Sequence, residues 1–289
     1  MTHQAAQLEK FLATKSNKPK KTRFVSITSG KGGVGKSTIS SNLAYTLSNA
    51  GLKVGIFDAD IGLANLDIMF NVKINKNILH VLKGEATVSD ILIPITKDLV
   101  LIPGESGDEI LKYSDKALFE RFMQEAHVLD DLDVMIIDTG AGIGEHIQLF
   151  LQAADDVVVV TVPDPAAITD AYATIKLTAK LRNDIYVVMN QVKNENESKN
   201  IFDKIKKVAS LNIGNSLKLE LLGKINADER VSQCVKRRKL ISKEYPSSHS
   251  SRDISKIAQT ISKKLERNVL VEPNNSGLSG LFNRLMEHF

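Results

Sequence analysis

The chain has 289 residues, 43% of them hydrophobic, which suffices for one large α/β core with short appendages. Its formal net charge of +4 permits an anionic partner without requiring one. The single cysteine, Cys234, excludes intrachain disulfides and cysteine-cluster metal sites. Without an apolar stretch in the first twenty residues, or any apolar run near about 18 residues, we expect no signal peptide, no membrane-spanning helix and a cytoplasmic location.

The first predicted elements follow an N-terminal extension, residues 1–22, in which a short helical pattern precedes a basic stretch with one proline. Residues 23–29 are rich in β-branched side chains, which is typical of a strand. Residues 38–49 have apolar side chains at helical spacing and are closed by Gly51, which predicts a helix. The glycine-rich segment between them therefore connects a strand to a helix.

That connecting segment is a phosphate-binding loop with a second lysine built into it. It satisfies the pattern G-x-x-x-x-G-K-[ST], whose glycines let backbone N–H groups surround phosphate oxygens. We expect Lys36 to reach the β- and γ-phosphates and the Ser37 hydroxyl to ligate Mg²⁺. Lys31 is not required by this pattern. The nucleotide-binding residues predicted here are Gly30, Lys31, Gly32, Gly33, Val34, Gly35, Lys36, Ser37 and Thr38.

Strand-like runs recur along the rest of the chain, and most are continuously apolar, as strands buried on both faces are. Helical patterns separate them. This alternation predicts an α/β fold with a doubly wound, mostly parallel sheet flanked by helices, and ligands at the carboxyl ends of the strands. The runs are 54–58, 99–103, 134–138, 157–162, 185–190 and 219–225, and the helical patterns include 116–129, 168–181 and 198–211.

Three aspartates after apolar runs carry the predicted hydrolytic chemistry. Asp138 follows four apolar residues in the Walker B arrangement, so we expect it to hold Mg²⁺ through water. No glutamate follows it, and residues 139–142 form a small segment suited to sensing a γ-phosphate. We therefore assign the attacking water to Asp60 and a place in the Mg²⁺ shell to Asp58. These residues thus predict nucleotide hydrolysis with Mg²⁺ as a cofactor.

The last residues of the chain show an apolar stripe after a linker at 268–277. The stripe is typical of one face of an amphipathic helix that lies on a membrane. The polar face has only Arg284 as a firm positive charge, and the alternative is a helix docked on the core. The residues of the stripe are Leu278, Leu281, Phe282, Leu285, Met286 and Phe289.

The loop at 30–37, together with the segments 58–67 and 138–143, resembles the deviant-Walker-A ATPases of the MinD/ParA family. The resemblance covers about residues 23–240. It implies a slow, switch-type ATP hydrolase with ATP/ADP and Mg²⁺ as cofactors. It also implies a homodimer that sandwiches ATP, in which Lys31 reaches the partner's nucleotide much as an arginine finger does. It also implies that Asp60 orients the attacking water, so Lys31, Lys36 and Asp60 form the expected catalytic set.

The resemblance extends to the dimer face and the base. It implies that Asn65 and Gly142 lie at the dimer face with Lys31, and that Asn190 reads the adenine. Asn226 stands where MinD carries a proline beside the base, so we include it as a candidate nucleotide contact.

The N-terminal extension resembles a motif of the family's flagellar branch, D-Q-A-x-x-L-R. Gln4, Ala5 and Leu8 match it, whereas His3 and Glu9 replace the aspartate and the arginine. The match implies an FlhF-type GTPase as a partner, and the alternative is a disordered leader. The tail in turn resembles the family's membrane-targeting helix.

These features predict a MinD-like ATPase that dimerises on ATP, binds the inner face of the cell membrane as a dimer and regulates flagellar number and placement. Flagellar basal-body proteins and an FlhF-type GTPase are the expected partners. The expected organisation is an extension at 1–22, a P-loop ATPase domain at 23–267 and a linker with a membrane-targeting helix at 268–289.

Two alternatives share this fold. One is a MinD-type regulator of the division site, which the N-terminal extension disfavours. The other is a ParA-like DNA-partition ATPase, which the basic cluster at 236–239 allows and the tail stripe disfavours. An iron–sulfur scaffold would need cysteine pairs and is excluded.

Overall fold

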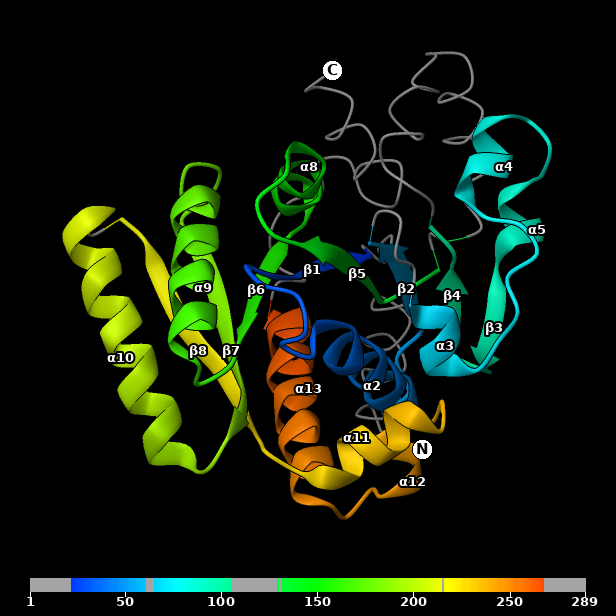
Figure 1. Cartoon of the computed structure of the whole chain (residues 1–289). Coiled ribbons are helices and arrows are strands. Elements are labelled where there is room, and N and C mark those ends of the chain that lie inside the picture. The colour runs from blue at the N-terminus through cyan, green and yellow to red at the C-terminus, as the bar shows by residue number, and fades with distance from the viewer. Residues whose placement is uncertain (1–21, 61–64, 105–128, 130, 215, 268–289) are drawn as a thin grey trace, which may run out of the picture.

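In the computed structural model, residues 22–60, 65–104, 129, 131–214 and 216–267 are described. They contain one eight-stranded sheet with the strand order β3-β4-β2-β5-β1-β6-β7-β8 (Figure 1). The strands are β1 (Arg23–Ser29), β2 (Val54–Ala59), β3 (Ile93–Thr96), β4 (Leu99–Ile102), β5 (Val134–Ala141), β6 (Asp156–Thr161), β7 (Asp184–Val192) and β8 (Lys218–Asn226).

All the strands of this sheet run parallel except β3, which pairs antiparallel with β4 at one edge. The doubly wound, mostly parallel sheet predicted from the sequence is therefore confirmed. The central strands β2 and β6 are buried along their whole length, in keeping with their continuous apolar runs. Parallel pairing brings the carboxyl ends of seven strands to one edge of the sheet, which we call the carboxyl edge.

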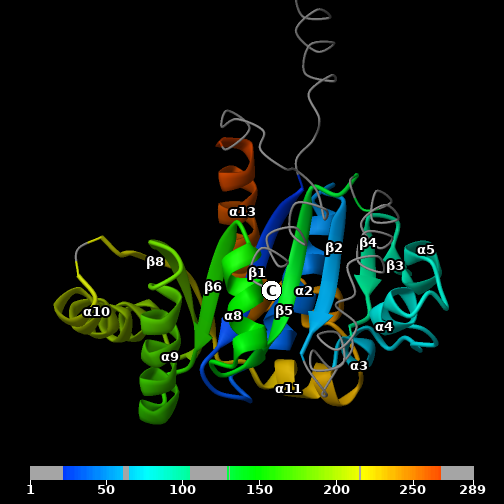
Figure 2. The same cartoon turned by 90° about the horizontal axis from the view of Figure 1, so that it is seen from above.

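Helices cover both faces of the sheet (Figures 1 and 2). One face carries α2, α3, α11, α12 and α13, and the other carries α4, α5, α8, α9 and α10. The bounds are α2 (Lys36–Asn49), α3 (Leu66–Phe70), α4 (Ile78–Leu82), α5 (Val88–Ile91), α8 (Glu145–Ala153), α9 (Pro165–Thr178), α10 (Glu195–Asn212), α11 (Glu229–Lys236), α12 (Ile241–Glu244) and α13 (His249–Arg267).

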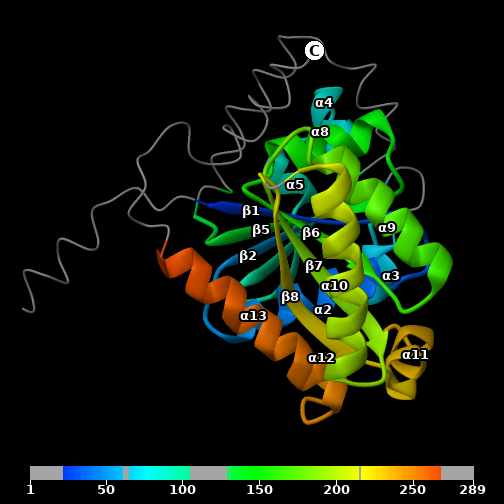
Figure 3. The ribbon, with the colours of Figure 1, turned by 90° about the vertical axis from the view of Figure 1, so that its left-hand side faces the viewer.

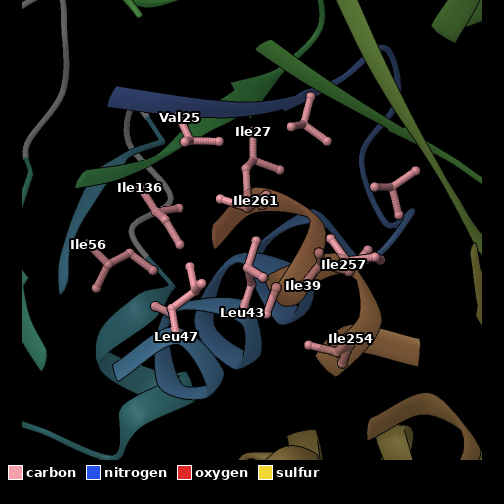
Figure 4. Close-up of a cluster of buried hydrophobic side chains, with 14 of the residues drawn as sticks. Val25, Ile27, Ile39, Leu43, Leu47, Ile56, Ile136, Ile254, Ile257 and Ile261 are labelled. Atoms are coloured by element: carbon pink, nitrogen blue, oxygen red, sulfur yellow. The ribbon is translucent and has the colours of Figure 1, made fainter. Parts of the chain in front are cut away.

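The core on the first face joins α2 and α13 to the strands beneath them. Figure 4 shows Leu43 of α2 and Ile261 of α13 among side chains from the strands, including Ile27 of β1. Burying an aliphatic side chain of this size contributes about 1.5–3 kcal/mol. This packing fixes the start of α2 against the sheet, and with it the end of the phosphate loop.

Helix α13 crosses the sheet from the carboxyl edge to the opposite, amino edge. Near its start, Asp253 accepts a hydrogen bond from the backbone N–H of Asn226, at the end of β8. Near its end, Lys264 donates to the Tyr186 hydroxyl and to Glu220, which lie early in β7 and β8. Figure 3 shows the last turn of α13 and the start of β1 on the same side of the molecule.

Several elements differ in extent from the predicted ranges. Helix α9 begins at Pro165 rather than near residue 168, because Asp164 caps it by accepting from the Ala167 N–H and proline favours the first helical position. Helix α10 likewise begins earlier, after the cap Asn194. Strand β5 continues three residues past Asp138, since Ala141 still pairs with Ser29 of β1.

Three predicted features lie outside the described residues. They are most of the helical pattern at 116–129, the partner peptide with Gln4, Ala5 and Leu8, and the membrane-targeting stripe in the tail at 268–289. Among the helices that are described, none is long and apolar enough to cross a membrane.

Candidate nucleotide site

The phosphate loop between β1 and α2 has positions that only glycine fits. Gly33 and Gly35 have φ angles of 81° and 91°, in the left-handed region. A Cβ atom on Gly35 would also lie 2.5 Å from Nδ2 of Asn190, and one on Gly30 would lie 2.2 Å from the carbonyl of Asp170. The loop therefore runs close against β7 and α9, and it delivers the N-terminus of α2 to the carboxyl edge, where N–H groups favour an anion.

The ammonium group of Lys36 lies among polar groups contributed by three elements. Its Nζ is 3.1 Å from Oδ1 of Asp138, 3.9 Å from Oδ2 of Asp60 and 3.4 Å from Oγ of Ser37. Lys36 is 6% exposed and Asp138 1% exposed, so the pair is buried. A buried charge is tolerated when it is paired in this way. The structure thus brings together three residues that the sequence assigned to phosphate, magnesium and water.

The Asp138 carboxylate has one oxygen with two donors and one without any. Oδ1 accepts from Lys36 and, at 2.7 Å, from the Ser40 hydroxyl. Oδ2 is buried and has no hydrogen-bond partner among the described residues. A buried carboxylate oxygen without a donor, near the hydroxyl of Ser37, fits a cation or a water molecule that a cation holds.

The oxygen-bearing side chains around Oδ2 of Asp138 also fit Mg²⁺. Within the described ranges, no three acidic, histidine or cysteine side chains gather into an all-protein metal site. Mg²⁺ commonly keeps several waters and binds through one or two carboxylates together with nucleotide phosphates. Ser37 and Asp138 would hold it here, with Asp58 close by.

The carboxylate of Asp58 is buried and bonded to backbone. Oδ2 accepts from the N–H groups of Asn65 and Leu66, both at 3.1 Å, and Oδ1 from that of Asp60 at 3.4 Å. Burial raises the pKa of Asp58 to about 7; the bond from Leu66 opposes this rise, and the nearby charge of Asp138 adds to it. Asp58 therefore ties the end of β2 to the start of α3, besides lying next to the predicted magnesium ligand.

Asp60 lies over β5 beside the Lys36–Asp138 pair. A Cβ atom on Gly140 would lie 3.1 Å from Oδ1 of Asp60, so the glycine leaves room for the carboxylate. Gly142, at φ 104°, donates its N–H to the carbonyl of Ser29. Asn65 is exposed at the start of α3.

Lys31, the second lysine of the loop, contacts its own chain. Its Nζ lies 3.5 Å from Oδ1 of Asp164, the residue that caps α9. Both side chains are about half exposed, at 48% and 52%. An exposed pair of this kind is worth about 0–1 kcal/mol, so it holds Lys31 only weakly.

The two asparagines predicted near the base lie at the ends of β7 and β8, which are neighbours in the sheet. Asn190 donates through Nδ2 to the carbonyl of Val34, 2.8 Å away, and so supports the phosphate loop. The side-chain oxygen of Asn226 accepts from Lys224 at 2.7 Å, and Lys224 also pairs with Asp253 at 2.9 Å. Asn226 is therefore held by a polar network between β8 and α13.

Two residues of this site were not predicted from the sequence. Ser40 lies one helical turn after Lys36 and on the same side of α2, a spacing that would have identified it. No sequence pattern would have identified Asp164, because its contact with Lys31 depends on the relative positions of β6 and the phosphate loop in the fold.

The chain is similar in sequence to known proteins. The ParA family model, described as NUBPL iron-transfer P-loop NTPase, matches residues 20–262. The chain is 47% identical, over 100% of its length and 99% of the relative's, to the flagellum site-determining protein YlxH of Helicobacter pylori. It is 32% identical to the antiactivator FleN of Pseudomonas aeruginosa, covering 83% of this chain and 86% of FleN.

Solved structures give the same fold. The cell division protein MinD of Aquifex aeolicus is 25% identical with a TM-score of 0.64, covering 88% of this chain and 100% of that one. MinD of Pyrococcus horikoshii, solved with Mg-ADP, has a TM-score of 0.68 at 21% identity, covering 87% and 100%. The chain therefore belongs to the ParA family of P-loop NTPases, within its MinD-like flagellar branch.

Proposed function

We propose that this protein is an ATPase that dimerises on ATP, binds the membrane as a dimer and regulates flagellar number and placement. The observation that carries the hydrolytic part is the buried Lys36–Asp138 pair, with the partly buried Asp60 beside it, at the carboxyl edge next to the N-terminus of α2. The full-length similarity to a flagellum site-determining protein supports the flagellar role.

The side chains divide the chemistry between them. The Lys36 ammonium moves from the Asp138 carboxylate to the phosphates, and the loop N–H groups surround the phosphate oxygens. Asp60 orients the attacking water, since its carboxylate lies beside Lys36 and above Gly140. Bound Mg²⁺ would supply charge neutralisation between the phosphates, held by Ser37 and Asp138. Asn190 and Asn226 would contact the base.

The proposed dimerisation would depend on Lys31. To reach the nucleotide of a second copy, Lys31 exchanges its weak pair with Asp164 for the partner's phosphates. A charge-assisted bond to phosphate is stronger than an exposed pair with a carboxylate, so ATP favours the exchange. Asn65 and Gly142 would lie at the same dimer face.

Membrane binding would rest on the tail. A twelve-residue helix is marginal in water, so one stripe from Leu278 to Phe289 has low affinity for a bilayer. Two tails on one ATP-linked dimer gain by effective concentration. Dimerisation would thereby switch membrane binding on, and hydrolysis would switch it off. The N-terminal extension would stimulate an FlhF-type GTPase and so connect the switch to the flagellum.

Size-exclusion chromatography with ATP and with ADP, run beside co-sedimentation with phosphatidylglycerol-containing vesicles, tests this function. We expect a dimer that sediments with vesicles in ATP, and a monomer that stays in solution in ADP. Lys31→Ala should remain monomeric in ATP. Lys53→Ala is a matched control, because Lys53 is also half exposed and pairs with an aspartate, 3.2 Å away. Equal vesicle binding by the ADP form would refute the coupling.

The GTPase partner has its own test. A peptide of residues 1–20 should accelerate GTP hydrolysis by an FlhF-type GTPase, whereas the same peptide with Gln4, Ala5 and Leu8 replaced should not. If both peptides leave hydrolysis unchanged, the extension has another role.

A further inference from the structure

Ser40 of α2 donates its hydroxyl to the Asp138 carboxylate. The side chain is fully buried, at 0% exposure, one turn after Lys36. Its Oγ lies 2.7 Å from Oδ1 of Asp138 and 3.1 Å from the backbone carbonyl of Lys36. A hydroxyl has one proton to donate, and the shorter bond to a carboxylate is the stronger. Ser40 therefore serves chiefly Asp138.

Lys36 shares the same oxygen of Asp138, 3.1 Å away. Because Lys36 is the residue expected to bind phosphate, its bond to Asp138 weakens when nucleotide enters. Ser40 is not expected to bind phosphate. Ile39 and Leu43, its neighbours on α2, are buried in the core (Figure 4). The Ser40 hydroxyl is thus the donor that remains hydrogen-bonded to Oδ1 of Asp138 when nucleotide binds.

We propose that Ser40 is a positioning residue for Asp138. By holding Oδ1, it keeps the carboxylate turned so that Oδ2, which has no partner among the described residues, faces the Mg²⁺ position. This inference rests on the proposed function, since it assumes that Asp138 serves magnesium and nucleotide. It assigns to α2 a second contribution to the site, beyond the loop that precedes the helix.

The neighbouring Ser41 provides a matched control within the same helix. Its side chain is equally buried, but its hydroxyl donates only to backbone carbonyls, those of Ser37 at 2.8 Å and Thr38 at 3.1 Å. Loss of that hydroxyl costs a helix-backbone bond and leaves Asp138 unchanged. The two serines therefore separate positioning of the carboxylate from packing of the helix.

The test measures binding of a fluorescent ADP analogue as MgCl₂ is titrated, and again in EDTA, for the full chain. For Ser40→Ala, we expect the Mg²⁺ concentration at half-maximal effect to rise about tenfold, which is typical when a group behind a metal ligand is lost. Affinity in EDTA should stay within about twofold of the unchanged protein. Ser41→Ala should leave the Mg²⁺ dependence unchanged.

Ser40→Cys keeps the shape of the side chain at a slightly larger volume but has a far weaker donor, and it covers the case in which Ser40→Ala does not fold. It should show the same shift in Mg²⁺ dependence. Unchanged Mg²⁺ dependence in the folded Ser40 variants, or an equal shift in Ser41→Ala, would overturn the positioning role of Ser40. It would leave the magnesium role of Asp138 intact. If the unaltered protein binds the analogue equally well with Mg²⁺ and in EDTA, the magnesium role of Asp138 fails too.

Discussion

The ammonium group of Lys36 lies close to the carboxylates of both Asp138 and Asp60. Its substitution tests both folding and binding, because the lysine compensates buried negative charge and is also expected to hold phosphate. Asp58 adds a third acidic side chain to the same small volume.

For Lys36→Ala, we expect nucleotide binding to fall below detection and the free energy of unfolding to fall by about 3–5 kcal/mol. Removing one partner of a buried pair leaves the other charge uncompensated. Urea denaturation and binding of a fluorescent ADP analogue would measure the two effects. A variant that binds the analogue with unchanged affinity would contradict the assignment of this loop to phosphate.

Replacing Asp60 separates hydrolysis from binding. Asp60→Ala should bind ATP and remain dimeric, while turnover falls by about 10²–10⁴-fold, the usual contribution of a group that activates the nucleophile. Phosphate release and sedimentation velocity in ATP would measure the two properties. A monomer in ATP would show that Asp60 acts in assembly rather than in orienting water.

At Asp164, one carboxylate both caps α9 and pairs with Lys31. Asp164→Ser should keep the cap, because serine is a good N-cap residue, but it loses the charge. We expect tighter ATP-dependent dimerisation by at most about thirtyfold, since each of the two protomers gives up one exposed pair worth at most about fivefold. Analytical ultracentrifugation with Asp164→Asn alongside would check this. Unchanged dimerisation would mean that Asp164 does not compete for Lys31.

Among the elements, those with continuous apolar sequence were predicted well. Strands β2, β5, β6 and β7 occur where the apolar runs indicated. Strand β3 was missed because its four residues, Ile-Pro-Ile-Thr, contain a proline and form an edge strand without such a run. Helix α13 was not among the predicted patterns, although Ile254, Ile257 and Ile261 recur at helical spacing and are buried.

In the site, too, some features could be predicted from the sequence and others could not. The phosphate loop and Asp138 follow from motifs, since backbone geometry and phosphate chemistry require particular residues at fixed spacing. The contacts of Lys31 with Asp164, and of Asn226 with Lys224, depend on which strands become neighbours. A single sequence carries no local pattern for that order.

The packing of α13 on β8 is close enough to test directly. A Cβ atom on Gly223 would lie 2.6 Å from Cγ1 of Ile257. We expect Gly223→Ala to cost about 1–3 kcal/mol by overpacking and Ile257→Ala about 2–5 kcal/mol by cavity formation. The double variant should cost clearly less than the sum, because the new methyl group occupies part of the cavity.

Urea denaturation of the two single variants and the double variant would measure this coupling. Pairing Gly223→Ala with Ile254→Ala is the control, since Ile254 is buried on the same helix but is not among the three nearest contacts of Gly223. Strict additivity for the first pair would contradict the predicted contact.

For the molecule as a whole, the predicted nucleotide site lies at the carboxyl edge, whereas the predicted membrane segment follows α13, which ends at the amino edge. We therefore expect deletion of residues 278–289 to abolish vesicle co-sedimentation while leaving ATP hydrolysis without vesicles nearly unchanged. Thermal unfolding should also be unaffected. A large loss of folded protein would show that this segment packs on the core instead.

Helix α13 also separates the two ends of the described chain from the predicted nucleotide site. Its 19 residues correspond to a length of about 28 Å at about 1.5 Å per residue. The described chain starts at Thr22, beside Leu132 at the amino edge, and leaves α13 at that same edge. Both ends of the described chain thus lie on the side of the sheet opposite the phosphate loop, roughly one helix length from it.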